Sequence, residues 1–233
     1  MFDTFQRYLF PVQYIKTRIM RPPLPVPILE VGPNGPGLFR CFQNSDISLT
    51  TLDITDAHAG EKKEYPEINF ITYDGEKMPF PSDAFEIVLC IDVLEHIPPE
   101  KRNHFLGELF RVSRKTIFLS FPVSTSRAPE KVLQKIFFNR FSFLREHENF
   151  GLPELSEIHS LVEKNTDWKR VKTEGTINRW LWIPVKLFSS LLHQILKKKK
   201  QGIRRTFSLH QKSLGKLLRF GTCYSYTLLL EKK

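Results

Sequence analysis

Short apolar segments that each end in an acidic residue are the feature that most constrains the fold of this chain. Four occur, PILEVG, ISLTTLDIT, EINFITYDG and AFEIVLCIDV, and their acids are Glu30, Asp53, Asp74 and Asp92. A helical segment, PPEKRNHFLGELFRVS, and a fifth apolar segment, KTIFLSFPV, follow them. Apolar strands that alternate with helices predict an α/β fold whose mainly parallel sheet is covered on both faces. Ligands of such sheets bind at the carboxyl ends of the strands, so the four acids are expected to meet there.

The rest of the chain is predicted to complete one domain. Residues 3–19 read as a basic amphipathic helix interrupted by Pro11, residues 153–165 as a helix, and residues 167–177 and 223–233 as two further strands. We expect a single domain over 1–233 with these parts: an N-terminal helix and connector (1–25), a cofactor-binding half (26–122), and a substrate-side half (123–233) with a basic amphipathic insertion at about 180–220.

Composition places the chain among globular proteins of a reducing compartment. Of its 233 residues, 41% are hydrophobic, which suits one domain with a single large core. Cys41, Cys90 and Cys223 form neither a C-x-x-C pair nor an even set for disulfides. The N-terminal segment has no unbroken apolar run typical of a secretory signal, and no stretch approaches the ~20 apolar residues of a membrane span. A cytoplasmic location is expected, with the inner face of the membrane as a peripheral site.

Positive charge is concentrated in the C-terminal third. From Lys164 to Lys233 there are 17 Lys and Arg residues against three acids, whereas residues 1–163 carry 18 basic and 22 acidic side chains. Such asymmetry indicates an anionic partner such as phospholipid, nucleic acid or a phosphorylated substrate, or a surface that is simply kept soluble.

The loop in ILEVGPNGPGLF joins the first predicted strand to a helix. Glycine permits close backbone approach, and a helix N-terminus offers free N–H groups, so a dinucleotide, a nucleotide phosphate or S-adenosylmethionine could bind there. Asp53 lies 21 residues beyond Gly32, where an acid that closes the second strand meets ribose hydroxyls. Several carboxylates around one cleft repel a pyrophosphate and attract a sulfonium cation, which favours S-adenosylmethionine.

Three stretches carry a resemblance to a known family: ILEVGPNGPGLF, TTLDIT and YDGEKMPFPSDAFEIVLCIDVLEHI with the helix after it. They resemble class I S-adenosylmethionine-dependent methyltransferases, most closely the branch that includes ubiquinone-type methyltransferases, over about Pro27 to Pro122. CYSYTLLLEKK resembles the closing strand of that fold. The resemblance implies a Rossmann-like, doubly wound, mostly parallel seven-stranded sheet with an antiparallel last strand and a helical insertion before it.

The resemblance also implies S-adenosylmethionine as the cofactor. The glycine loop would line its methionine portion, the acid after the second strand its ribose, the acid after the third strand its adenine, and the fourth acid with His96 its sulfonium. The cofactor-binding residues expected are Glu30, Gly32, Asn34, Gly35, Gly37, Asp53, Ile54, Asp74, Gly75, Asp92 and Val93. Asn34 replaces the usual middle glycine, and Pro33 and Pro36 remove two backbone donors, so the loop departs from the family pattern.

FSFLREHENFGLP, residues 141–153, is predicted to supply groups on the substrate side. It places titratable side chains between aromatic ones after the fifth strand, a pattern typical of a general base or an orienting group. His147 is the first candidate for the base and His96 the second, and Arg145 is a candidate for holding an anionic group. Alternatively, His147 and Glu148 cap the helix that begins near Pro153. No metal is expected, because the histidines lack ligand spacing.

The segment from Trp180 to Lys197 has one apolar half and one polar half on a helical wheel, with tryptophans at one end and lysines at the other. It fits a helix on an anionic membrane surface, with contact over Trp180–Arg205. It fits equally a lid over the active site or a dimer contact. The sequence does not define the oligomeric state.

These features favour a methyltransferase (EC 2.1.1.-) that acts on a small-molecule, glycan or lipid-linked acceptor. Nucleic acid is disfavoured because the segment after the fourth strand, IDVLEH, lacks the N/D-P-P-Y/F tetrad that amino methyltransferases use for a flipped base. Two alternatives remain open: a non-catalytic binding protein with a methyltransferase-like fold, and an RNA methyltransferase that uses the basic C-terminal third.

Overall fold

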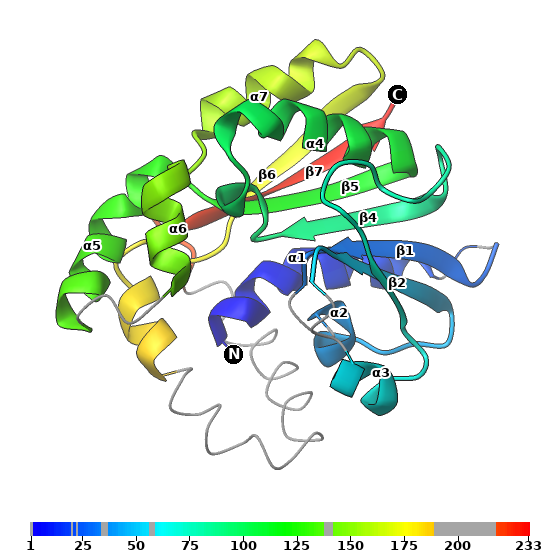
Figure 1. Ribbon diagram of the computed structural model, residues 1–233, viewed down its shortest axis with the longest axis horizontal. Helices are drawn as coiled ribbons and strands as arrows, with labels where there is room; N and C mark the ends of the chain where they lie inside the picture. Colours follow the sequence, from blue (N-terminus) through cyan, green and yellow to red (C-terminus); the bar gives the residue numbers. More distant parts are fainter. Residues whose placement is uncertain are drawn as a thin grey trace.

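A seven-stranded sheet organises the molecule (Figure 1). The computed structural model describes residues 2–19, 21, 23–33, 37–55, 59–137, 142–188 and 218–233. The strand order is β3-β2-β1-β4-β5-β7-β6, and β7 runs antiparallel to β5 and β6. The strands are β1 (Val26–Val31), β2 (Ile47–Asp53), β3 (Asn69–Thr72), β4 (Phe85–Ile91), β5 (Ser113–Pro122), β6 (Trp168–Gly175) and β7 (Ser225–Lys232). The predicted mostly parallel sheet with an antiparallel last strand is confirmed.

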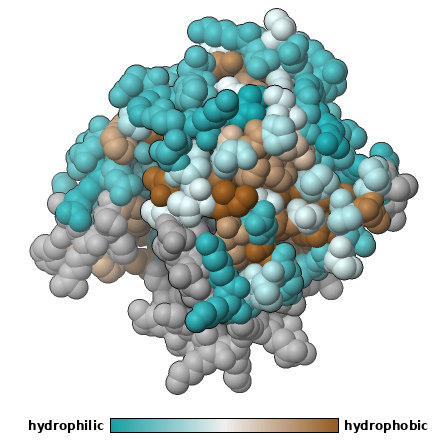
Figure 2. All heavy atoms as spheres, turned by 45° about the vertical axis from the view of Figure 1, so that its right-hand side comes forward, coloured by the Kyte–Doolittle hydropathy of each residue, from teal (hydrophilic) through white to brown (hydrophobic). Residues whose placement is uncertain are grey.

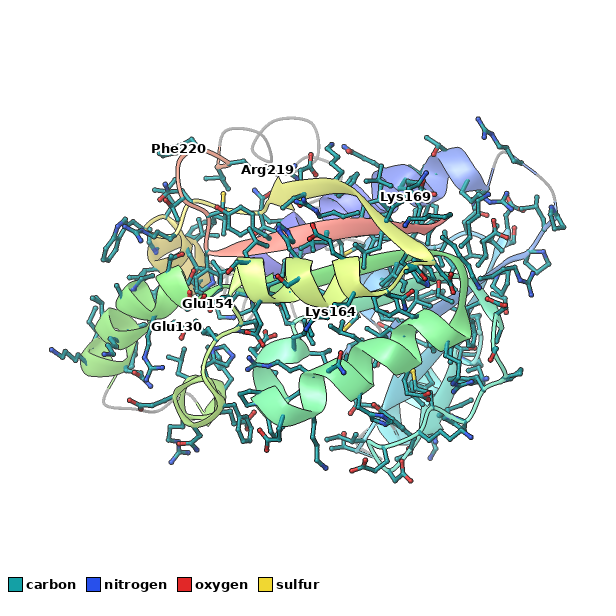
Figure 3. The ribbon with its side chains drawn as sticks, turned by 90° about the horizontal axis from the view of Figure 1, so that it is seen from above. Glu130, Glu154, Lys164, Lys169, Arg219 and Phe220 are labelled. Carbon is teal, nitrogen blue, oxygen red and sulfur yellow. The ribbon has the colours of Figure 1, made fainter. Side chains whose placement is uncertain are left out.

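Helices cover both faces of the sheet. They are α1 (Phe2–Arg18), α2 (Gly37–Cys41), α3 (Ala59–Glu64), α4 (Pro99–Val112), α5 (Arg127–Ile136), α6 (Ser142–Phe150) and α7 (Leu155–Lys164), with 3-10 turns η1 (Leu94–His96) and η2 (Ser124–Ser126). One core joins α4 and α7 to the sheet, and a second core joins α1 and α2 to its other face. Seen from above, α4 and α7 run side by side over the strands (Figure 3).

The two cores follow from the alternation of side chains along the central strands. In β4, Val88 and Cys90 enter the core under α4 and α7, whereas Ile87 and Leu89 enter the core under α1 and α2. All seven residues of β4 are buried. A parallel strand that is apolar on both faces can only lie at the centre of a covered sheet, and β4 lies between β1 and β5.

Helix α1 is continuous across Pro11, contrary to the predicted interruption. Its inward side chains include Val12 and Ile15, both with no exposed surface, and Tyr14 packs edge-on against Phe118 of β5 at 5.3 Å between ring centroids. A proline inside a helix removes one backbone hydrogen bond, and burial of this apolar face outweighs that loss. The helix is therefore part of the domain core.

The direction in which successive strands are added to the sheet reverses between β1 and β4. Chain order runs outward from β1 to β3, and then returns to the other side of β1 with β4 and β5. Neighbouring helices diverge at such a point, which leaves a crevice at the carboxyl ends of the strands. The amino end of α1 and the helices α5 and α6 lie at this edge of the sheet (Figure 1).

The sequence patterns missed α3, α5 and α6. Residues 127–136 and 142–150 were not assigned to helices, and His147 and Glu148 lie inside α6 rather than at the cap of α7. Residues 182–188 are helical, as expected for the start of the insertion, while residues 189–217 lie outside the described part. Trp182 is fully buried with Leu133, Leu144, Ile177 and Tyr224 in a third core, so the first turns of the insertion pack on the domain.

One face of the molecule carries a central group of apolar side chains framed by hydrophilic ones (Figure 2).

Among the helices that the structure describes, none has both the length and the apolar character that crossing a bilayer requires.

The burial of α1 predicts a large loss of stability on truncation of its core side chain. Ile15→Ala should lower the free energy of unfolding by about 2–5 kcal/mol, since it leaves a cavity against the sheet. Lys16→Ala, at the next and exposed position, should change it by no more than about 0.5 kcal/mol. Urea denaturation followed by circular dichroism measures both, and equal effects of the two variants would contradict the described packing.

Candidate active site

A cavity of about 760 Å³ opens at the carboxyl ends of β1, β2 and β4. That volume lies within the range of small-molecule sites. One end is formed by the residues that follow these strands, together with two side chains from α1; these are Gly32, Asp53, Ile54, Asp92, Val93, Arg7 and Tyr8. The other end is formed by η1, α6, the helix at 182–188 and the segment before β7; these residues are Glu95, His96, Phe143, Glu146, His147, Trp182, Lys186 and Tyr224.

Glu30 lies behind the glycine loop and does not line the cavity. Its fully buried carboxylate accepts hydrogen bonds from the backbone N–H of Leu38, at 3.0 and 2.9 Å, and from the hydroxyl of Tyr8 at 2.6 Å. A Cβ added to Gly37 would collide with this carboxylate. Glu30 therefore holds the start of α2 and the amino-terminal half of α1 in place, and contributes to the cavity through the backbone.

Gly32 and Asp92 occupy backbone conformations that suit a ligand site. Gly32 has φ +62°, and a Cβ at this position would lie 2.7 Å from Cγ2 of Val93. Asp92 has φ +57°, an uncommon value for a residue other than glycine. Its carboxylate pairs with Arg7, and its Oδ1 is buried with no hydrogen-bond partner among the described residues. The pair attaches the amino end of α1 to the end of β4.

Asp53 is the last residue of β2 and Asp74 follows the neighbouring strand β3, but the two have different surroundings. The Oδ1 of Asp53 accepts hydrogen bonds from the backbone and hydroxyl of Thr55 at 3.2 and 3.3 Å, beside the cavity. Asp74 is exposed, and its Oδ1 accepts from the backbone N–H of Glu76 at 2.8 Å. Asp74 therefore shapes a turn, and it is Gly75 of that turn that lines the cavity.

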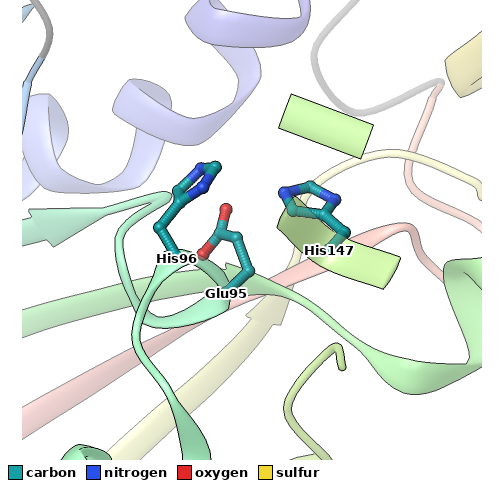
Figure 4. Close-up of side chains that lie close together, drawn as sticks. All are labelled: Glu95, His96 and His147. Atoms are coloured by element: carbon teal, nitrogen blue, oxygen red, sulfur yellow. The ribbon is translucent and has the colours of Figure 1, made fainter. Parts of the chain in front are cut away.

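Glu95, His96 and His147 lie close together at the second end of the cavity. The Glu95 carboxylate lies between the two imidazoles in the close-up view, with His147 coming from α6 and the other two from η1 (Figure 4). The ring centroids of the histidines are 5.1 Å apart. Burial lowers the pKa of His96, with a further contribution from His147, so the His96 imidazole is neutral at pH 7.

Both histidines bind a carboxylate through Nδ1. His147 Nδ1 lies 2.8 Å from Oε1 of Glu130, and His96 Nδ1 lies 2.6 Å from Oε2 of Glu146. A carboxylate accepts hydrogen bonds, which assigns the proton of each neutral imidazole to Nδ1 and the lone pair to Nε2. Glu130 also accepts from the Tyr224 hydroxyl at 2.5 Å, so its carboxylate is fixed from two sides.

Arg102 joins the elements that carry these residues. It is buried, and its guanidinium donates to the carbonyls of Leu94 and Ile97 in and after η1, and to that of Gly151 after α6, at 3.2, 3.1 and 2.6 Å. Glu95 is 1% exposed, and burial raises its pKa to about 8. The cluster therefore has little freedom to rearrange.

The structure brings together most of the predicted site residues. Those that line the cavity are Gly32, Asp53, Ile54, Gly75, Asp92, Val93, His96 and His147. Three predicted residues do not line the cavity but act behind it: Glu30, Gly37 and Asp74. Arg145 is exposed on α6 and does not line the cavity either. Two others, Asn34 and Gly35, lie outside the described residues. The sequence patterns missed Arg7, Tyr8, Glu95, Glu130 and Tyr224. Glu95 alone had a local signal, since it precedes His96.

Residues 29–120 match the family described as methyltransferase domain. Curated protein sequences give no significant match.

Several solved structures share the fold of this chain at low identity. Magnesium protoporphyrin IX methyltransferase from Synechocystis PCC 6803, with bound SAH, has 16% identity, TM-score 0.61, and coverage of 99% of this chain and 84% of that one. The plantazolicin methyltransferase BpumL, in complex with SAH, has 16% identity, TM-score 0.59, and coverage of 99% and 85%. The mycolic acid cyclopropane synthase CmaA1, complexed with SAH and CTAB, has 14% identity, TM-score 0.55, and coverage of 89% and 78%.

The position of Glu30 predicts that its charge supports both the stability of this protein and the binding of a ligand in the cavity. Glu30→Gln should lower the free energy of unfolding by about 1–3 kcal/mol, because one acceptor oxygen is replaced by an amide donor facing the Leu38 N–H. Affinity for S-adenosylhomocysteine should fall with it. Glu67→Gln, at an exposed position, is the matched control. Thermal denaturation and calorimetry measure the effects, and a Glu30 variant as stable as the control would refute this role.

Proposed function

We propose that the protein transfers a methyl group from S-adenosylmethionine to a small-molecule acceptor bound beside His96 and His147. The observation that supports this is one cavity whose two ends differ in chemistry. The strand ends bring Asp53 and Asp92 to one end, and α6 brings a buried imidazole with an open Nε2 to the other. Methyl transfer requires a donor and an acceptor to be aligned with water excluded, which a shared cavity provides.

The first end fits the cofactor. Gly32 provides close backbone approach, since a side chain there would meet Val93, and the buried Oδ1 of Asp92 lacks a partner among the described residues. We assign Asp53 to the ribose, Ile54 and Gly75 to the adenine, and Gly32, Asp92 and Val93 to the methionine portion. When bound, S-adenosylmethionine would supply a methyl group on a sulfonium sulfur, and a nucleophile that attacks this methyl carbon would displace S-adenosylhomocysteine.

The second end fits an acceptor that carries a proton. Glu130 holds the Nδ1–H of His147, so Nε2 can accept a proton from an acceptor hydroxyl or amine. Trp182 and Tyr224 stack with ring centroids 4.0 Å apart and form an apolar wall, and Lys186 adds a positive charge. These walls favour an acceptor with an apolar body and a polar tip.

A lipid-linked or glycan acceptor is the finer part of the proposal. Trp180 lies just before the helix at 182–188, and Phe188 is the last residue of that range. Their side chains are 49% and 57% exposed, which suits contact with an apolar or interfacial partner. Contact with an anionic membrane through Trp180–Arg205 also belongs to this proposal, because residues 189–205 lie outside the described part. The RNA alternative rests largely on the same undescribed residues. The cytoplasmic location and the division of the domain at residues 25 and 122 stay predictions.

Asp53 is predicted to control cofactor affinity. Asp53→Ala should weaken the binding of S-adenosylhomocysteine about tenfold or more, since hydrogen bonds between ribose hydroxyls and a carboxylate would be lost. Asp167→Ala, an exposed position at the start of β6, should leave binding unchanged. Calorimetric titration checks both, with NADH as a ligand that should not bind. No binding of S-adenosylhomocysteine to the unmodified protein would refute the proposed function.

His147 is predicted to act on the acceptor and not on the cofactor. His147→Gln should reduce turnover about 10²–10⁴-fold, the range typical of losing a general base, while S-adenosylhomocysteine affinity stays within about twofold. His159→Gln on α7, whose imidazole contacts Arg170 away from the cavity, is the control. Formation of S-adenosylhomocysteine with a panel of phenols, alcohols and amines provides the readout, and full turnover in the His147 variant would exclude this role.

A further inference from the structure

The donor atoms at the acceptor end form a set that methyl transfer by itself does not explain. One ligand atom each from Glu95, His96 and His147 lies within 4.8 Å of the others. Two of these side chains, Glu95 and His147, are 1% and 4% exposed. Within the part of the chain that the structure describes, Glu95 Oε2 and His147 Nε2 have no hydrogen-bond partner.

Two unpartnered polar atoms at one buried place are unusual in a native protein. Leaving a buried acceptor unsatisfied costs about 1–3 kcal/mol, so such atoms usually have a bound partner. Both atoms can bind a cation, the imidazole nitrogen through its lone pair and the Glu95 oxygen in the ionised form of the carboxyl group. A neutral donor could satisfy one of them, whereas a single cation placed between them satisfies both.

The surroundings of the two histidines match those of metal ligands. An imidazole that binds a metal through one nitrogen usually gives its other N–H to a carboxylate, which fixes the ring. Glu130 does this for His147 and Glu146 does it for His96, so both lone pairs lie on Nε2. Tyr224 in turn holds Glu130. The supporting shell is therefore in place.

The charges around the cluster also favour a cation. Glu130 and Glu146 provide two carboxylates next to it. Arg7 from α1 and Lys186 from the helix at 182–188 are nearby positive charges on the cavity wall, and Arg7 pairs with Asp92. Arg102 reaches the cluster from α4, but its guanidinium donates to backbone carbonyls around η1 and after α6.

We propose that Glu95, His96 and His147 bind a divalent first-row transition-metal cation, with Zn²⁺ as the best match, at the acceptor end of the cavity. Two imidazoles and one carboxylate suit Zn²⁺ and its neighbours, whereas Mg²⁺ prefers oxygen ligands. Ligand atoms on one Zn²⁺ lie about 3–3.5 Å apart, given Zn–ligand bonds of about 2.0–2.2 Å.

Three protein ligands leave an open position that faces the cavity, as in catalytic zinc sites. A hydroxyl of the acceptor bound there would lose its proton to water in the cavity more readily, because a bound cation stabilises the anion. With the cation in place, His147 would be its ligand and water would take the proton. Metal binding itself does not depend on the proposed methyl transfer.

Calorimetric titration of ZnCl₂ into the full chain, first freed of metal with a chelator, tests the site. We expect one Zn²⁺ per chain in the micromolar range or tighter, and no heat from MgCl₂. Glu95→Gln and His147→Ala should each weaken Zn²⁺ binding about a hundredfold or more, and Glu146→Gln about tenfold, as for the loss of an outer partner. His104→Ala, which removes another cavity histidine outside the cluster, should bind Zn²⁺ as the unmodified protein does.

Co²⁺ absorption and S-adenosylhomocysteine binding complete the test. Co²⁺ should give visible bands in the unmodified protein and lose them in His147→Ala. Each variant should keep its circular dichroism spectrum and its affinity for S-adenosylhomocysteine, which shows that the fold and the first end of the cavity persist. Absence of Zn²⁺ binding, or equal binding by His147→Ala, would overturn the metal site alone. Failure to bind S-adenosylhomocysteine would instead count against the proposed function.

Discussion

The parallel alignment of β1, β2, β4 and β5 is the constraint on which the rest of the molecule depends. Parallel strands bring their carboxyl ends to one edge, and the change of course between β1 and β4 opens that edge. Polar residues that follow separate strands therefore lie together in space although they are far apart in the sequence. Burial of both faces of the sheet then fixes the register, since a shift by one residue would exchange the two cores.

The fold was predictable because its signals are local. Each central strand is a short apolar run with punctuation at its ends, and α4 begins with prolines and shows one apolar face. The helices α5 and α6 were missed for a different reason: they are nine or ten residues long and carry many charges. The role of their buried residues, among them Glu130 and His147, depends on packing with Tyr224. Tyr224 lies 94 residues beyond Glu130 in the sequence.

The two ends of the candidate site also differ in how far the sequence predicts them. The residues of its first end lie at the carboxyl ends of the strands, so Asp53 and Asp92 could be predicted from the sequence. The position of Glu30 behind the cavity and the exposed turn at Asp74 could not be predicted. The acceptor end is assembled from η1, α6 and the segment before β7. No spacing in the sequence links His96 to His147, and the expectation that the histidines could not bind a metal rested on that spacing. Proximity in space, established by Arg102 and the carboxylate partners, provides the link.

The turn η1 belongs to both ends of the cavity. Asp92 and Val93, immediately before it, line the first end, and Glu95 and His96, within it, line the second. Arg102 fastens this turn to the end of α6. A molecule that fills the first end therefore lies against the backbone that carries the second. With the proposed assignment of the two ends, this connection favours a sequential kinetic scheme in which the methyl donor enters first and the spent donor leaves last.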